Sequence, residues 1–262
     1  MTSGEKKPPK VPVRETFAKP LPRRFYSTVT TETHATSGAL VLLDGRPAKT
    51  PGKRDLILPT LSLARAIAGE WAAQAERIDP SRMPLTRLAN TALDGVAARA
   101  AEVRADVVKY AASDLVCYRA DRPAGLVRRQ TEHWDRVLAW AESRLGAPLD
   151  TGQGVVHVPQ PAASLEAIRA ATAPLDPFRL TALHTMTTLT GSALLALGVT
   201  LAAWKAEAAW TAAHVDEDWQ IAEWGEDAEA AARRQARWVE MSAAARMLAL
   251  LEDGPGGAAA HP

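Results

Sequence analysis

The chain has 262 residues, 31 of them basic and 30 acidic, and its net charge of +1 gives no general attraction for nucleic acid or an anionic membrane. Its single cysteine, Cys117, excludes a disulfide framework and suits a reducing compartment. Because Cys117 lies among apolar neighbours, we expect a buried, inert thiol. The length allows one large domain or two modest ones.

The two ends of the chain have a different composition from the rest. Residues 1–23 are polar and basic, contain five prolines and lack the apolar stretch of a secretory signal. We therefore expect a disordered arm there and a disordered tail over residues 254–262, which are rich in glycine and alanine.

Residues 24–60 carry the pattern of β-strands. The segment from Arg24 to Thr36 alternates and is rich in β-branched residues. Asp44–Gly45 then separates two apolar runs, which is a strong signal for a hairpin, and residues 55–60 form a further short apolar segment. The sequence predicts a small antiparallel β domain over residues 24–60.

From Leu61 the apolar residues recur at helical spacing, and we expect an all-helical domain over residues 61–253. Thr86 opens a long helical pattern that extends to about residue 112, with a bend expected at Gly95. The predicted fold class is therefore α+β, with a small N-terminal β domain followed by a larger helical domain.

A stretch of 25 residues, Leu180 to Trp204, contains no charged side chain. It is long enough to span a bilayer, but it could equally form a helix buried inside the protein. Eight of its residues are polar, and Gly198 followed by Thr200 suggests that one helix ends and another begins there. We favour a buried central helix over a membrane span.

The sequence lacks the common motifs of catalysis and nucleotide binding, including glycine-rich phosphate loops and a G-x-S-x-G elbow. His214 lies one helical turn from Asp218 and close to Asp216, and His184 lies in the charge-free stretch. A helical metal-dependent hydrolase that uses these residues is the alternative hypothesis. We favour a solvated acidic face and a hydrogen-bonded core histidine.

Residues 216–229 interleave seven acidic side chains with two tryptophans. An amphipathic helix, a break at Gly225 and a second helix with an acidic first turn explain most of this pattern. A second interpretation is a protein-binding face, because tryptophan is common at the centres of interfaces. Glu240 stands among the apolar residues Trp238, Val239 and Met241, and we favour a place on the solvent face of the last helix, with a contact residue for a partner as the alternative. The candidate partner-binding residues are Trp219, Trp224, Trp238 and Glu240.

Five segments resemble, in their order and spacing, the F1-ATPase assembly chaperones that act on the alpha subunit. The likeness extends from about Tyr26 to Leu251. The segments are GEWAAQAERIDPSRMPLTRLANTALD (69–94), SDLVCYRAD (113–121), EHWDRVLAWAESRLG (132–146), LTALHTMTTLTGSALLALGV (180–199) and DEDWQIAEWGEDAEA (216–230).

The resemblance implies a chaperone with no enzymatic activity and no cofactor. It implies binding of an unassembled alpha subunit, whose exposed apolar interface is prone to aggregation until the beta subunit covers it. Glu240 matches an acidic residue that the family uses functionally, and Trp71 matches a tryptophan with an expected structural role. A W-Q-x-x-x-W-G signature is matched by Trp219, Gln220 and Trp224.

Mitochondrial members of that family carry cleavable presequences, which the basic arm does not resemble. We therefore expect a bacterial cytoplasmic protein, or a matrix protein if the source is eukaryotic. We also expect a monomer that binds neither nucleic acid nor a membrane.

Overall fold

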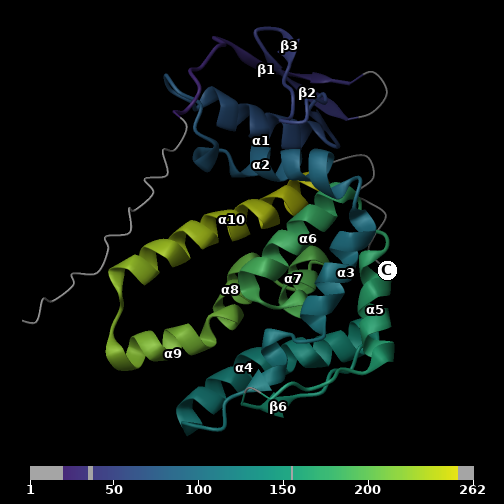
Figure 1. Cartoon of the computed structure of the whole chain (residues 1–262), viewed down its shortest axis with the longest axis vertical. Coiled ribbons are helices and arrows are strands. Elements are labelled where there is room, and N and C mark those ends of the chain that lie inside the picture. Colours follow the sequence, from purple (N-terminus) through teal and green to yellow (C-terminus); the bar gives the residue numbers. More distant parts are fainter. Residues whose placement is uncertain (1–19, 35–37, 155, 253–262) are drawn as a thin grey trace, which may run out of the picture.

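A computed structural model describes residues 20–34, 38–154 and 156–252. A small sheet lies at one end of the molecule, and helices form the remainder (Figure 1). This arrangement confirms the predicted α+β class. Most of the expected arm at residues 1–23, and all of the expected tail at residues 254–262, lie outside the described residues.

The sheet is built around one central strand. The strand β2 (Ala39–Leu43) pairs antiparallel with β1 (Val29–Thr33), β3 (Arg46–Pro47) and β4 (Ile57–Leu58). Its side chains alternate between buried and half-buried positions, as expected for a strand with one face on the core. The β2–β3 turn is the predicted Asp44–Gly45 pair, and both residues have positive φ angles of 48° and 77°.

The first helix, α1 (Leu61–Ala72), packs on this sheet and buries Leu63 and Ile67 against it. The hydroxyl of Tyr26 donates to the carbonyl oxygen of Trp71 at 2.7 Å, and the two rings meet edge to face at 5.6 Å. Trp71 therefore packs α1 on the chain that precedes β1. The helix α1 packs on the sheet, so contacts cross the predicted boundary between residues 60 and 61. The division into two domains at that boundary stays a prediction.

The helical part places α6 at its centre, where α10, α7 and α3 all contact it (Figure 1). Two short strands pair parallel beside α4. The remaining α-helices and β-strands of the described residues are α2 (Pro84–Asn90), α3 (Ala100–Ala111), α4 (Ala124–Trp140), α5 (Ala162–Thr172), α6 (Pro177–Thr190), α7 (Ala193–Thr200), α8 (Ala206–Ala213), α9 (Val215–Trp224), α10 (Ala228–Glu252), β5 (Tyr118–Arg119) and β6 (Gly152–Gln153).

The charge-free stretch forms two helices, α6 and α7, rather than one helix that ends at Gly198. The break is at Gly191, which has a φ of 68°, and Ser192 caps α7 by accepting from the Leu195 amide at 3.0 Å. Gly198 lies inside α7, so its predicted role as a helix stop was wrong. Both helices are largely buried, and no helix in the described part of the chain is long and apolar enough to cross a membrane.

Gly198 has a packing role instead. A Cβ atom there would lie 1.9 Å from the ring of Trp204, so only glycine leaves room for that ring. The Trp204 indole is held in place by its hydrogen bond to the Leu195 carbonyl oxygen, at 3.0 Å.

The predicted long helix from Thr86 is also interrupted. A π-helical turn at Thr91–Val96 follows α2, and α3 begins only at Ala100. Asp94 in this turn accepts hydrogen bonds from the Thr50 hydroxyl and the Gly52 amide, both at 2.8 Å. These bonds tie the turn to the loop after β3, a tertiary contact that helical spacing alone does not reveal.

One buried carboxylate joins two distant segments. Asp114 is fully buried and accepts hydrogen bonds from the Val116 amide and, at 3.0 Å, from the Leu194 amide at the start of α7. Burial raises the pKa of Asp114 to about 6. The neighbouring thiol, Cys117, is also buried, and burial together with the charge of Asp114 raises its pKa to about 12, in keeping with an inert thiol.

Candidate partner-binding site

The last two helices form a hairpin that contains the four candidate residues. Gly225, with a φ of 89°, ends α9, and the chain turns back into α10 (Figure 1). The acidic side chains in the first turn of α9 and at the start of α10 complement the positive ends of the two helix dipoles. The break expected at Gly225 is therefore present.

The base of the hairpin is fastened to α4. The amide of Gln130, itself buried, donates to the Asp216 carboxylate at 2.7 Å. Trp219 packs on the start of α4 so closely that a Cβ atom on Gly125 would lie 2.3 Å from its ring, and the guanidinium of Arg129 lies 5.1 Å from the centre of that ring. Trp219 is thus half-buried in a contact between helices.

The two helices of the hairpin are joined by an ion pair. Arg234 of α10 donates to the Asp218 carboxylate of α9 at 2.5 Å, and this bond raises the pKa of Arg234. The Trp238 ring lies 5.4 Å from that of Trp210, beside a cavity of about 580 Å³ between α8 and α10. Trp238 is half-buried, as Trp219 is.

Trp224 differs from the other two tryptophans. It is the last residue of α9, and 79% of its surface is exposed. Its neighbours Glu223, Glu226 and Asp227 are exposed as well. The end of the hairpin therefore presents a large apolar ring surrounded by acidic side chains.

Glu240 lies further along α10 and pairs with Arg87 of α2. Its side chain is 30% exposed, so part of the side chain faces solvent while the pair joins two helices. Sequence reasoning did not anticipate this pairing, because the two residues are 153 positions apart.

The structure gives the side chains of the hydrolase alternative different partners, although His214, Asp216 and Asp218 lie within one turn at the start of α9. Buried His214 donates from Nδ1 to the Trp210 carbonyl oxygen at 2.7 Å, and burial lowers its pKa. The carboxylates of Asp216 and Asp218 bond to Gln130 and Arg234, as described above. His184 instead pairs with Asp106 of α3 at 2.8 Å. Within residues 20–34, 38–154 and 156–252 no three potential ligands gather to hold a metal, so nothing in this region favours that alternative.

A family model for the ATP12 chaperone protein matches residues 23–142. The crystal structure of Atp12 from Paracoccus denitrificans is 45% identical, covers 88% of this chain and 98% of its own, and superimposes with a TM-score of 0.83. The chain belongs to the ATP12 chaperone family.

Two further structures agree with that assignment. A point mutant of the Paracoccus Atp12p gives the same identity, coverage and TM-score as the unmutated protein. A candidate chaperone from Agrobacterium tumefaciens is also 45% identical, covers 89% of this chain and 88% of its own, and has a TM-score of 0.85. The expected family, and the α+β fold that it implies, are confirmed, and membership supports a role as an assembly chaperone.

Proposed function

We propose that this ATP12-family protein binds the unassembled alpha subunit of F1-ATPase, covers the surface that the beta subunit later takes, and then releases it to the beta subunit. The observation that carries the proposal is the 45% identity to Paracoccus Atp12 over nearly the whole of that chain. An unassembled subunit exposes apolar interface, and a chaperone that covers this interface needs only a complementary surface, without catalysis or a cofactor.

The proposed contact surface is the exposed end of the α9–α10 hairpin together with the adjoining face of α10. Trp224 supplies a large exposed apolar ring, the kind of residue that dominates binding energy at interfaces. Trp219 and Trp238 hold the hairpin to α4 and α8, which keeps Trp224 in a defined position. Glu240 offers the exposed part of its side chain on α10. The proposed site residues are Trp219, Trp224, Trp238 and Glu240.

The proposal also covers the setting in which the protein works. We place it in the bacterial cytoplasm as a monomer, with the alpha subunit as its partner. We assign it no enzymatic activity and no interaction with nucleic acid or with the membrane interior.

The test is the aggregation of purified alpha subunit, followed by light scattering with and without this protein. We expect this protein, at an amount equimolar to the alpha subunit, to suppress the light scattering. We expect added beta subunit to release the chaperone from the alpha subunit. An unchanged scattering curve at excess chaperone would sink the proposal.

Affinity for the alpha subunit and thermal stability, measured on variants, separate a contact residue from a residue with a purely structural role. Trp224→Ala removes an exposed ring, so the fold should keep its thermal stability within about 0.5 kcal/mol while affinity for the alpha subunit falls roughly tenfold or more. Phe25→Ala, which removes another largely exposed aromatic ring far from the hairpin, is the matched control and should bind normally. Equal loss in both variants would argue against the hairpin as the contact surface.

Glu240 is best tested by replacement with glutamine. A lysine there would face Arg87 and add a repulsion that could disturb the helix pair, whereas glutamine keeps the size of the side chain. We expect Glu240→Gln to bind the alpha subunit more weakly while its circular dichroism spectrum is unchanged. If Glu240→Gln bound the alpha subunit as well as the native protein does, the role of Glu240 would be limited to its contact with α2.

A further inference from the structure

The end of the α9–α10 hairpin carries an unbalanced negative charge. Residues 223–229 contain four acidic side chains and no basic one. One of the four is neutralised by an ion pair with Arg233, and the neighbouring Arg234 is occupied by Asp218. Together these five acidic and two basic side chains leave a net charge of −3 at the hairpin end. They are Asp218, Glu223, Glu226, Asp227, Glu229, Arg233 and Arg234.

Three of these carboxylates have no cation beside them. Glu223, Glu226 and Asp227 are exposed and form no ion pair within the described part of the chain. The next basic residue along α10, Arg237, donates instead to the Leu189 carbonyl oxygen of α6. The turn between α9 and α10 lies at the left edge of the helical part, away from the sheet (Figure 1). The negative charge is therefore accessible to a partner.

Aromatic surfaces lie beside these carboxylates. The largely exposed ring of Trp224 directly follows Glu223 in α9. Glu226 lines the cavity of about 580 Å³ between α8 and α10, and the rings of Trp210 and Trp238 line the same cavity. The face of a tryptophan ring attracts a cation more strongly than the face of any other aromatic side chain. Tryptophan faces next to unpaired carboxylates therefore fit Lys and Arg side chains.

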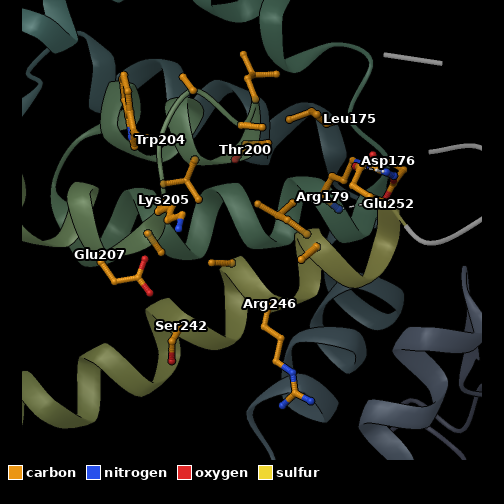
Figure 2. Close-up of a pocket in the computed structure, with 18 of the residues that line it drawn as sticks. Leu175, Asp176, Arg179, Thr200, Trp204, Lys205, Glu207, Ser242, Arg246 and Glu252 are labelled. Carbon is orange, nitrogen blue, oxygen red and sulfur yellow. Dashed lines mark hydrogen bonds and ion pairs between the residues drawn. The ribbon is translucent and has the colours of Figure 1, made fainter. Parts of the chain in front are cut away.

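The larger groove on the other half of α10 has no such asymmetry of charge (Figure 2). It has a volume of about 990 Å³, and its walls are the C-terminal half of α10, the start of α6 and the connection between α7 and α8. Its basic and acidic lining residues balance, so no charge there selects an occupant. They are Arg179, Lys205 and Arg246 against Asp176, Glu207 and Glu252.

We propose that the end of the hairpin binds a basic segment of the alpha subunit. One Lys or Arg side chain of that segment lies against the Trp224 ring near Glu223, and a second enters the cavity beside Glu226. Nucleic acid and anionic lipid carry the same sign of charge as the hairpin end, so neither fits it. The inference rests on the proposed function and adds to it the chemistry of the partner segment.

Neutralising the two glutamates tests the proposal. Glu223→Gln together with Glu226→Gln removes two charges, keeps the size of both exposed side chains, and leaves Asp227 to cap α10 through the Ala230 amide. The matched control, Glu76→Gln together with Glu142→Gln, removes the same charge from exposed residues elsewhere that form no ion pair in the described region. We expect affinity for purified alpha subunit, measured by biolayer interferometry, to fall roughly tenfold in the first variant and to stay unchanged in the control.

Salt supplies a readout that a purely structural role would not change. Raising the salt concentration from about 0.15 M to about 1 M shortens the Debye length from about 8 Å to about 3 Å. We expect the native protein and the control to lose affinity over this range, and the Glu223→Gln/Glu226→Gln variant to change much less. A variant with native affinity and native salt dependence overturns the inference, and so does a variant that binds more tightly, because tighter binding indicates an acidic segment.

The outcomes separate this inference from the proposed function. If the unmodified protein does not bind the alpha subunit, the proposed function fails and the inference fails with it. If the unmodified protein binds and the Glu223→Gln/Glu226→Gln variant binds equally well, only the inference fails and the chaperone role stands. Circular dichroism and the melting temperature confirm that both variants are folded.

The chemistry of the partner segment is identified by a cross-link. Because the single native cysteine, Cys117, is buried and has a raised pKa, a cysteine that replaces the exposed Ala222 of α9 can be labelled selectively with a benzophenone maleimide. After illumination with the alpha subunit, mass spectrometry identifies the attached peptide. A segment that contains Lys or Arg supports the proposal. An acidic or uncharged segment, or a second copy of this chain, overturns it.

Discussion

Three tryptophans that look alike in the sequence occupy different environments in the fold. Trp219 and Trp238 are half-buried contacts between helices, and Trp224 is largely exposed at the end of the hairpin. Helical spacing alone cannot separate them, because each lies near acidic or basic residues and each could face either way. The exposure of each ring depends on whether another helix packs on it: α4 covers Trp219 and α8 covers Trp238.

At the residue scale, Asp114 should make stability depend on pH. Its pKa is about 6 in the folded protein against an ordinary value of 3.8, so the folded state favours the protonated form. The resulting stabilisation is fully present below the unfolded pKa and is lost as pH rises through about 6. We expect the unfolding free energy of the native protein, relative to Asp114→Asn, to fall by roughly 3 kcal/mol over that range. Urea denaturation at several pH values measures it.

The control for this prediction is Asp79→Asn. The side chain and amide of Ser81 bond to Asp79 and lower its pKa, so its contribution is present above the unfolded pKa and lost as pH falls. The native protein relative to Asp79→Asn should therefore change with pH in the opposite direction. If the stability of the native protein relative to both variants changed with pH in the same direction, the carboxyl of Asp114 would not be the cause of the pH dependence.

At the scale of single elements, the helix boundaries show what local pattern can and cannot specify. The hairpin at Asp44–Gly45 and the break at Gly225 were predicted correctly, because each depends on a residue with a positive φ angle. The break between α6 and α7 was placed at the wrong glycine. In the sequence, Gly191 precedes Ser192 and Gly198 is followed closely by Thr200, so each glycine is followed by a residue type that can cap a helix. The fold distinguishes them, because Gly191 has a φ of 68° and ends α6, whereas Gly198 lies inside α7 against the Trp204 ring.

Gly198 therefore gives a prediction about α7. Alanine there should destabilise the protein by roughly 1–3 kcal/mol, because its methyl group overlaps the Trp204 ring, which is also packed 4.8 Å from the Trp140 ring. Gly69, inside α1, has open space around its Cα, so Gly69→Ala should stabilise by roughly 0.5–1 kcal/mol through helix propensity. Thermal denaturation of the two variants checks the pair. A stabilising effect of Gly198→Ala would contradict the packing role.

At the scale of the whole molecule, few large apolar side chains among the described residues are exposed. Those in the described residues come from different parts of the chain, and stable dimers usually bury a continuous apolar area. They are Leu21, Phe25, Val156, Leu201, Trp224 and Val239.

We therefore expect the protein to sediment as a 28.0 kDa monomer and to form a one-to-one complex with the alpha subunit. Analytical ultracentrifugation of the protein alone and of the mixture measures both states. A dimer that persists at micromolar concentration would contradict the first part, and a complex with two chaperones would contradict the second.

The sequence by itself determined the α+β class, the hairpin turn, the burial of most of residues 180–204 and the family. These features depend on local periodicity, on turn residues and on the order of motifs along the chain. The tertiary structure decided which tryptophan is exposed, that Glu240 meets Arg87, and that a groove opens beside α10. Each of these depends on contacts between helices that are far apart in the chain, and the spacing within one helix carries no information about its neighbours.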